Sequence, residues 1–210
     1  MKRYTPLRMI RSGRYKSCFY GLKPEVRADV LRRMETLVAE NHEWCDRGNY
    51  GHLCNILSTL AIDQALAARG QSADERLAFL SENMWAALNP KPMNRLARLP
   101  FFMPLMKAVV PLGFSKKSGK GWRYVWHKDT DGPDEFRFEC TECLYQYIFS
   151  HYGVLDRFGP MFCHSDIVNY GSLPHTDFIR TQTLCQGGEL CDFCFIRHRR
   201  SEVLQRTTSI

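Results

Sequence analysis

Apolar residues recur at helical spacing through the N-terminal half of the chain. The first stretch, residues 24–37, begins with a proline, which suits a first helical turn. The second, residues 50–69, is followed by a glycine of the kind that ends helices. The third, residues 72–88, opens at Ser72 and has a glutamate three residues later, which is the pattern of a capping box. These stretches predict a helical region over residues 24–114.

The end of this region, residues 99–114, is apolar but contains three prolines. Because proline removes a helical hydrogen bond and clashes with the preceding turn, we expect a broken helix packed on the core. Two functional interpretations stay open: a mobile cover over a pocket, or a peripheral membrane contact favoured by the flanking lysines. The basic, glycine-containing residues 115–121 lack the spacing of a phosphate-binding loop and are predicted to be a flexible connector.

The hydrophobic period changes to two after this connector. Residues 122–138 alternate on both sides of a turn, which predicts a β-hairpin. Two helical stretches follow at residues 141–152 and 156–169, and residues 176–184 and 190–197 predict a second hairpin. The C-terminal half is therefore ββ-αα-ββ. The predicted fold class is α+β, with an N-terminal helical half packed against a C-terminal antiparallel sheet.

Composition and charge narrow the function classes. Hydrophobic residues make up 44% and charged residues 24% of the chain, which excludes wholesale disorder, and no apolar run reaches the roughly 18 residues that span a bilayer. The net charge is +7, and its excess lies in two acid-free zones, residues 1–23 and 83–128. Such a surface could attract a carboxylate substrate, lipid head groups or nucleic acid, or could simply keep the protein soluble. It is consistent with a small anionic substrate, which is the partner that we expect. No specific nucleic acid is expected, because the basic residues do not form a recognisable nucleic-acid-binding motif.

The chain start is rich in arginine but lacks the apolar core of a secretory signal, so a cytoplasmic location is expected. No transmembrane segment is predicted, and the oligomeric state stays open. The predicted organisation is a mobile basic arm over residues 1–23, the helical region 24–114, the flexible basic loop 115–121, an α+β region at 122–200 and a tail at 201–210.

Six of the nine cysteines lie between residues 140 and 194. An odd number without a signal sequence predicts reduced thiols. Two Cys-x-x-Cys pairs, Cys140 with Cys143 and Cys191 with Cys194, have spacings that a four-thiolate zinc site uses. However, Cys191 and Cys194 fall in a predicted strand, where a separation of three places them on opposite faces. We therefore disfavour that zinc site.

Two further features could carry chemistry. Cys163 and Asp166 share one face of a predicted helix, as a nucleophile or metal ligand beside a group that orients water or accepts a proton; a buried thiol and a capping carboxylate are the alternative. Arg180, placed mid-strand by the pattern, could clamp a carboxylate through two parallel hydrogen bonds, or could face solvent. Asp192 must point to the face opposite Cys191.

Four short motifs in the C-terminal half resemble those of a known protein family. The sequence contains Thr141-Glu-Cys-Leu-Tyr145, Phe162-Cys-x-x-Asp166, Phe178-x-Arg-Thr-x-Thr-Leu184 and Gly187-Gly-x-x-Cys-Asp-Phe-x-Phe195. In this order they resemble the L-2-amino-thiazoline-4-carboxylic acid hydrolase family over residues 134–197. The positions that match the family pattern are Cys143, Cys163, Asp166, Arg180, Gly188, Cys191 and Asp192, whereas Cys140, Cys185 and Cys194 are outside it.

The resemblance implies a hydrolase that opens a cyclic C–N/C–S substrate of the 2-amino-thiazoline-4-carboxylate type to a carbamoyl-cysteine, acting on the C–N bond of a cyclic amidine. It implies catalytic roles for Cys163 and Asp166 and substrate binding by Arg180. Supporting roles fall to Cys143, Gly188 and Asp192.

Two mechanisms stay open. Cys163 could attack the amidine carbon directly. Alternatively, Cys143, Cys163 and Cys191 could hold a divalent metal such as Zn²⁺ with one open position, although no cofactor is certain. The alternative function is a non-catalytic small-molecule or metal-binding module, similar to vinyl-reductase-type sensor domains. The enzyme hypothesis predicts that Cys163, Asp166 and Arg180 converge on one cleft.

Overall fold

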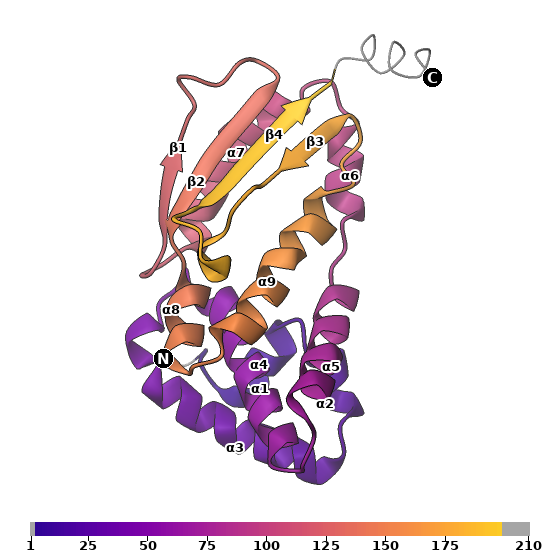
Figure 1. The fold of residues 1–210 in the computed structure, drawn as a ribbon, viewed down its shortest axis with the longest axis vertical. Coiled ribbons are helices and arrows are strands. Elements are labelled where there is room, and N and C mark those ends of the chain that lie inside the picture. The colour runs from indigo at the N-terminus through magenta and orange to yellow at the C-terminus, as the bar shows by residue number, and fades with distance from the viewer. Residues whose placement is uncertain (1–2, 199–210) are drawn as a thin grey trace.

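The computed structural model describes residues 3–198, in which helices come first and strands follow. The N-terminal elements are α1 (Pro6–Ser12), α2 (Lys16–Gly21), α3 (Pro24–Glu40), the short 3₁₀ helix η1 (His42–Trp44), α4 (Tyr50–Ala67), α5 (Ala73–Ala86), α6 (Lys91–Ala97) and α7 (Phe102–Lys117). The C-terminal elements are β1 (Arg123–Trp126), β2 (Glu135–Glu142), α8 (Leu144–His151), α9 (Leu155–Tyr170), β3 (Thr176–Ile179), the 3₁₀ helix η2 (Leu184–Gln186) and β4 (Cys191–Arg197). A helical lower part thus joins a sheet above it (Figure 1), and the α+β class is confirmed.

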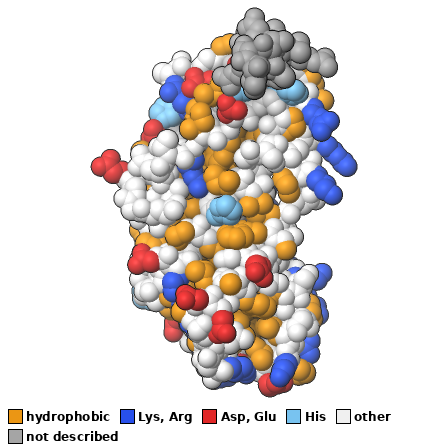
Figure 2. All heavy atoms as spheres, turned by 45° about the vertical axis from the view of Figure 1, so that its right-hand side comes forward, with side chains coloured by type: hydrophobic (Ala, Val, Ile, Leu, Met, Phe, Trp, Pro, Cys, Tyr) orange, Lys and Arg blue, Asp and Glu red, His pale blue; other side chains and the backbone are white. Residues whose placement is uncertain are grey.

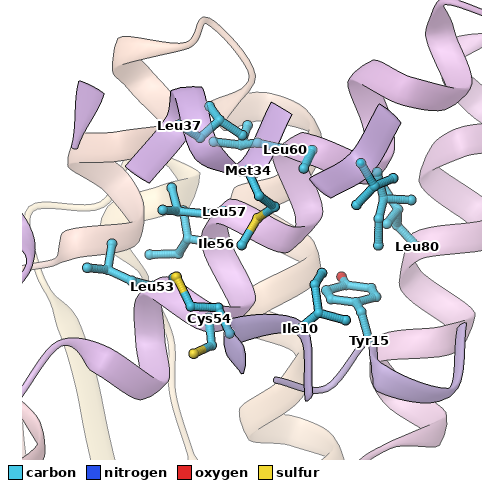
Figure 3. Close-up of a cluster of buried hydrophobic side chains, with 14 of the residues drawn as sticks. Ile10, Tyr15, Met34, Leu37, Leu53, Cys54, Ile56, Leu57, Leu60 and Leu80 are labelled. Atoms are coloured by element: carbon cyan, nitrogen blue, oxygen red, sulfur yellow. The ribbon is translucent and has the colours of Figure 1, made fainter. Parts of the chain in front are cut away.

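Helix α4 is the centre of the helical part. It is apolar around most of its circumference, which is the pattern of a helix surrounded by others. Side chains from α1, α3 and α5 pack around it, as Figure 3 shows for Ile10, Met34, Leu57 and Leu80. The predicted helix starts are confirmed, since α3 begins at its proline and α5 has a complete capping box at Ser72.

The four strands form one antiparallel sheet in the order β1-β2-β4-β3. One face carries aromatic side chains; Phe138 of β2 and Phe193 of β4 are paired in register and stack with their ring centroids 4.5 Å apart. Helix α7 covers this face, where Phe102, Met103 and Met106 join the same apolar cluster (Figure 1). The aromatic face therefore lies inside the molecule.

Helix α7 differs from the sequence-based prediction. Its 16 residues form one continuous helix that contains Pro111, and the break in the 91–117 segment falls earlier, between α6 and α7. Pro104 is compatible with this helix because it lies in the first turn, where backbone N–H groups have no helical partner. The outer side of α7 exposes Val109 and Leu112. A peripheral membrane contact there stays a prediction, and no helix within residues 3–198 has the length and apolarity to cross a membrane.

The chain start also differs from expectation. Residues 3–23, predicted to belong to a mobile basic arm, form α1 and α2, and Met9, Ile10, Tyr15 and Phe19 are buried in the main core. The mobile arm was predicted from the basic residues of this segment, whereas the apolar residues between them determine how the segment packs on the core. Figure 2 shows that Lys and Arg side chains gather along one edge of the upper half of the face that it presents.

The predicted flexible loop is likewise fixed to the helical part. Residues up to Lys117 belong to α7, and the next residues pack against the buried side chain of Asn49. This amide accepts hydrogen bonds from the Gly119 N–H at 3.0 Å and the Trp122 indole at 3.1 Å, and donates to the Lys120 carbonyl at 2.9 Å. Asn49 therefore connects the helical half to the start of the sheet.

Replacing Asn49 with alanine is expected to lower the free energy of unfolding by about 3 kcal/mol, because several buried backbone and indole groups lose their partner at once. Urea denaturation measures this loss. Asn83→Ala is the matched control, since within the described part of the chain the Asn83 side chain donates a single hydrogen bond, to the Phe79 carbonyl within α5. Equal losses in the two variants would contradict the assigned role of Asn49.

Candidate functional site

A cavity of about 380 Å³ lies beside the aromatic face of the sheet. Met106, Val110 and Phe114, which are four residues apart on α7, form one wall together with Phe138 and other sheet aromatics. This placement supports the interpretation of the α7 segment as a cover over a pocket. The volume lies within the range of roughly 300–1,000 Å³ that small-molecule sites occupy.

The cavity brings together the three predicted groups. Cys163 and Asp166 line it from α9, and Arg180 lines it from the segment that follows β3. Arg180 is therefore just beyond a strand end and not mid-strand as the alternating pattern predicted, because β3 ends at Ile179. The convergence that the enzyme hypothesis required is present.

Arg180 and Asp166 form an ion pair in the cavity wall. The Arg180 Nη1 donates to Asp166 Oδ2 at 2.7 Å and to the Cys163 carbonyl oxygen at 3.0 Å, and its side chain is only 7% exposed. One guanidinium nitrogen therefore connects both sequence-predicted catalytic residues. The Arg180 charge is already balanced by Asp166, so positioning Asp166 is the role that this geometry supports best.

The environment of Asp166 makes it a usable acid and base. Burial raises its pKa to about 6, and the positive charges of Arg180 and Arg14 oppose that rise. A carboxyl group with a pKa near neutrality can release and accept a proton within one catalytic cycle. Its side chain remains 31% exposed, so it can reach a molecule in the cavity.

Asp192 and Gly188 hold the segment that carries Arg180. Asp192 points to the face opposite Cys191, as predicted, and accepts hydrogen bonds from the Thr181 N–H at 2.9 Å and the Gln182 N–H at 2.8 Å. A Cβ on Gly188 would lie 2.9 Å from the Gln182 side-chain oxygen and 3.0 Å from the Thr183 carbonyl oxygen. Both residues therefore keep the backbone after Arg180 in place, and the supporting roles expected for them stay predictions.

Five thiols line the cavity, in two contact groups: Cys143 and Cys163 with Cys185, and Cys140 with Cys191. Cys140 and Cys191 face each other across β2 and β4. The set of Cys143, Cys163 and Cys191 that was expected for a metal lies within one cluster of thiols, in which Cys143 and Cys163 contact Cys185 while Cys191 contacts Cys140. Within residues 3–198, no three His, Cys, Asp or Glu side chains form a group that could hold a metal ion. We therefore assign no step of the mechanism to a metal.

Cys163 is the thiol best prepared for nucleophilic attack. A hydrogen bond from the Cys185 thiol, together with the Thr183 hydroxyl and the Arg180 charge, lowers its pKa below that of an ordinary thiol, although burial and Asp166 act in the opposite direction. The same contacts raise the pKa of Cys185, which therefore stays protonated as the donor. A lowered pKa increases the fraction of thiolate, which is the reactive form.

Cys194 lies on the outer face of the sheet. Its sulfur is 4.0 Å from a carboxylate oxygen of Glu135, whereas Cys191 lines the cavity on the inner face. The predicted separation of these two thiols is present, and Cys194 does not join the thiols of the cavity.

Sequence reasoning missed several cavity residues. His52 of α4 lines the cavity, and burial lowers its pKa to about 4, so the ring is neutral at physiological pH. Its Nε2 lies 3.1 Å from the Lys117 carbonyl and its Nδ1 lies 3.1 Å from the Tyr145 hydroxyl, so Nε2 carries the hydrogen and Tyr145 donates to Nδ1. The sequence around His52 contains no motif that would predict a place in the cavity, whereas Tyr145 is the last residue of the Thr141–Tyr145 motif.

Cys185 was also missed, and its position depends on Gly159. A Cβ at Gly159 would lie 2.8 Å from the Cys185 Cβ, so the glycine in α9 allows η2 to pack closely beside Cys163. The close approach of Cys185 could not be predicted from Gly159, because this glycine lies inside a helical pattern.

Iodoacetamide at limiting concentration and pH 7.5 is expected to alkylate Cys163 before the other cysteines. Its thiolate is stabilised and it is only partly buried, whereas the pKa of Cys45 and of Cys194, which are also partly buried, is raised. Peptide mass mapping at early times identifies the modified residue. Earlier labelling of Cys45 or Cys194 would contradict this assignment.

Comparison of the chain with known protein families agrees with the motifs. The model of the L-2-amino-thiazoline-4-carboxylic acid hydrolase family matches residues 54–195, well over half of the chain, and extends the resemblance into the helical half. No curated protein and no solved structure matches the chain. The matched range contains Cys163, Asp166 and Arg180 together with the segments that position them. The chain therefore belongs to the L-2-amino-thiazoline-4-carboxylic acid hydrolase family.

Proposed function

We propose that this protein hydrolyses a small cyclic amidine that carries a carboxylate, of the 2-amino-thiazoline-4-carboxylate type, to a carbamoyl-cysteine. The observation that supports this most is the shared cavity, where Cys163 and Asp166 are joined through one nitrogen of Arg180. The family membership supports hydrolysis as the reaction type.

In the first step, the Cys163 thiolate adds to the ring carbon that bears sulfur and both nitrogens. The electron pair of the C=N bond moves to the ring nitrogen, which takes a proton from Asp166. The exocyclic amino nitrogen then forms a double bond to this carbon with its lone pair, the ring C–N bond breaks, and the ring nitrogen leaves as an amine after a second proton arrives from solvent. The substrate is now linked to Cys163 through the former ring carbon.

In the second step, Asp166 acts as a base. It takes a proton from water as the water oxygen bonds to the same carbon, and the electron pair of the C=N bond formed in the first step returns to the exocyclic nitrogen. The bond from that carbon to Cys163 then breaks and its electron pair returns to the sulfur. The hydroxyl oxygen releases its remaining proton to solvent as it forms the C=O bond, so the carbon keeps the amino group, the oxygen and the former ring sulfur. The raised pKa of Asp166 suits this exchange, because the group must be protonated in one step and ionised in the next.

The test is incubation of the purified protein with 2-amino-thiazoline-4-carboxylate and analysis of the product. Breaking the C–N bond leaves the carbamoyl group on sulfur and frees an amine, whereas breaking the C–S bond frees a thiol. We expect a product with a free amine and no new thiol when it is quenched at once and analysed by mass spectrometry. Failure of the folded protein to open the ring would overturn the proposal.

A further inference from the structure

A turn near the chain start delivers an arginine to the cavity. Arg14 lies between α1 and α2, where its backbone N–H donates to Asn55 Oδ1 of α4 at 2.9 Å. The neighbouring Tyr15 is fully buried, and its hydroxyl accepts a hydrogen bond from Thr59 at 3.1 Å. On the other side, a Cβ at Gly13 would lie 3.1 Å from the Cys54 carbonyl oxygen. The backbone of Arg14 is thus fixed against α4 on both sides.

The guanidinium of Arg14 lines the cavity without a partner. Within residues 3–198 it makes no hydrogen bond or ion pair, although its charge acts on Asp166, Tyr145 and Tyr170 across the cavity. The side chain is partly buried and belongs to the lining of the cavity.

The other basic groups of the cavity are less suited to bind an anion. Arg180 is already paired with Asp166, and His52 is neutral. Lys117 is exposed, and its ammonium group lacks the planar fork of a guanidinium. Asp166 is the one carboxylate among the residues that line the described cavity, so the site retains net positive charge. A guanidinium with free N–H groups matches the planar geometry of a carboxylate through two parallel hydrogen bonds.

We propose that Arg14 binds the carboxylate of the substrate, the role that the sequence assigned to Arg180. This inference rests on the proposed function for the identity of the ligand. Arg14 lies outside the range matched by the family model. Carboxylate recognition would therefore come from outside the matched range, while the matched segments supply the reacting groups.

Arg14→Gln is expected to raise KM for 2-amino-thiazoline-4-carboxylate by about 10- to 100-fold and to leave kcat within about threefold, because the lost hydrogen bonds act equally in the ground state and the transition state. Arg14→Lys should recover part of the affinity, since it keeps the charge but not the fork. The matched control is Arg11→Gln, three residues earlier on α1, whose guanidinium is exposed and bonds the Tyr20 hydroxyl. Thermal unfolding verifies that each variant folds.

A second substrate separates charge recognition from damage to the fold. Wild-type protein should prefer the carboxylate over 2-amino-thiazoline, which lacks it, and Arg14→Gln should lose that preference. An unchanged preference in Arg14→Gln would overturn the inference.

A failure of the Arg14 inference can be distinguished from a failure of the proposed function by calorimetry. The affinity of Cys163→Ala for the same carboxylate is measured with Arg14 present and with Arg14→Gln added. If the carboxylate binds in a way that depends on Arg14 but the wild type does not turn it over, the hydrolase proposal alone is contradicted. Turnover with a KM that is unchanged in Arg14→Gln would sink the Arg14 assignment alone.

Discussion

Replacing Cys163 with alanine is expected to lower kcat by at least about 10³-fold, because the covalent route loses its nucleophile. KM should change little, since the proposed carboxylate contact lies elsewhere in the cavity. Cys163→Ser is expected to stay severely impaired, because a hydroxyl in the same place is far harder to ionise than the thiol. Steady-state kinetics with the thiazoline carboxylate measures both variants.

The matched control for Cys163 is Cys194→Ala. Cys194 is also partly buried, but it lies on the outer face of the sheet next to Glu135. We expect this variant to keep the activity of the wild type. If Cys163→Ala retained substantial kcat, thiol attack would be wrong, and a water molecule activated by Asp166 would have to act directly.

Replacing Asp166 with asparagine is expected to lower kcat by about 10²- to 10⁴-fold, the usual contribution of a positioned acid or base. The pH profile adds a sharper readout. Asp166 must be ionised to activate water, and its pKa is raised to about 6 by burial. When the second step limits the rate, kcat of the wild type should rise with pH through this value. This limb should be missing in Asp166→Asn.

The control for Asp166 is Asp156→Asn, which changes an exposed carboxylate in the first turn of the same helix. It should leave both kcat and the pH profile as they are in the wild type. A wild-type profile without any rise near pH 6, or an unchanged limb in Asp166→Asn, would contradict the role of Asp166.

Local patterns predicted the elements of this fold well where one residue type controls the backbone. The proline at the start of α3, the capping box at Ser72 and the alternation in β2 all act over a few residues. The same local reasoning failed for α7, where prolines predicted a broken helix. It also failed at residues 3–23, since burial against α4 is decided by residues that are distant in sequence.

The candidate site was predictable in part for the same reason. Cys163 and Asp166 are neighbours on one helix, so their spacing was sufficient to pair them. The approach of Cys185 requires a glycine on another element, and the approach of Arg14 requires a turn that is held by Asn55. Neither contact leaves a periodic signal. The ion pair between Arg180 and Asp166 could not be predicted, because it is visible only in three dimensions.

The account depends most on a covalent bond between Cys163 and the amidine carbon. Intact-protein mass spectrometry of acid-quenched Asp166→Asn with 2-amino-thiazoline-4-carboxylate tests it most directly. This variant lacks the base that the second step requires, whereas solvent can supply the proton of the first step, so it should form the bond but hydrolyse it slowly. We predict a species heavier by the whole substrate, since no atom leaves before water attacks, and peptide mapping should place the added mass on Cys163. Ring opening by the wild type without such a species in the variant, together with activity in Cys163→Ala, would contradict the account.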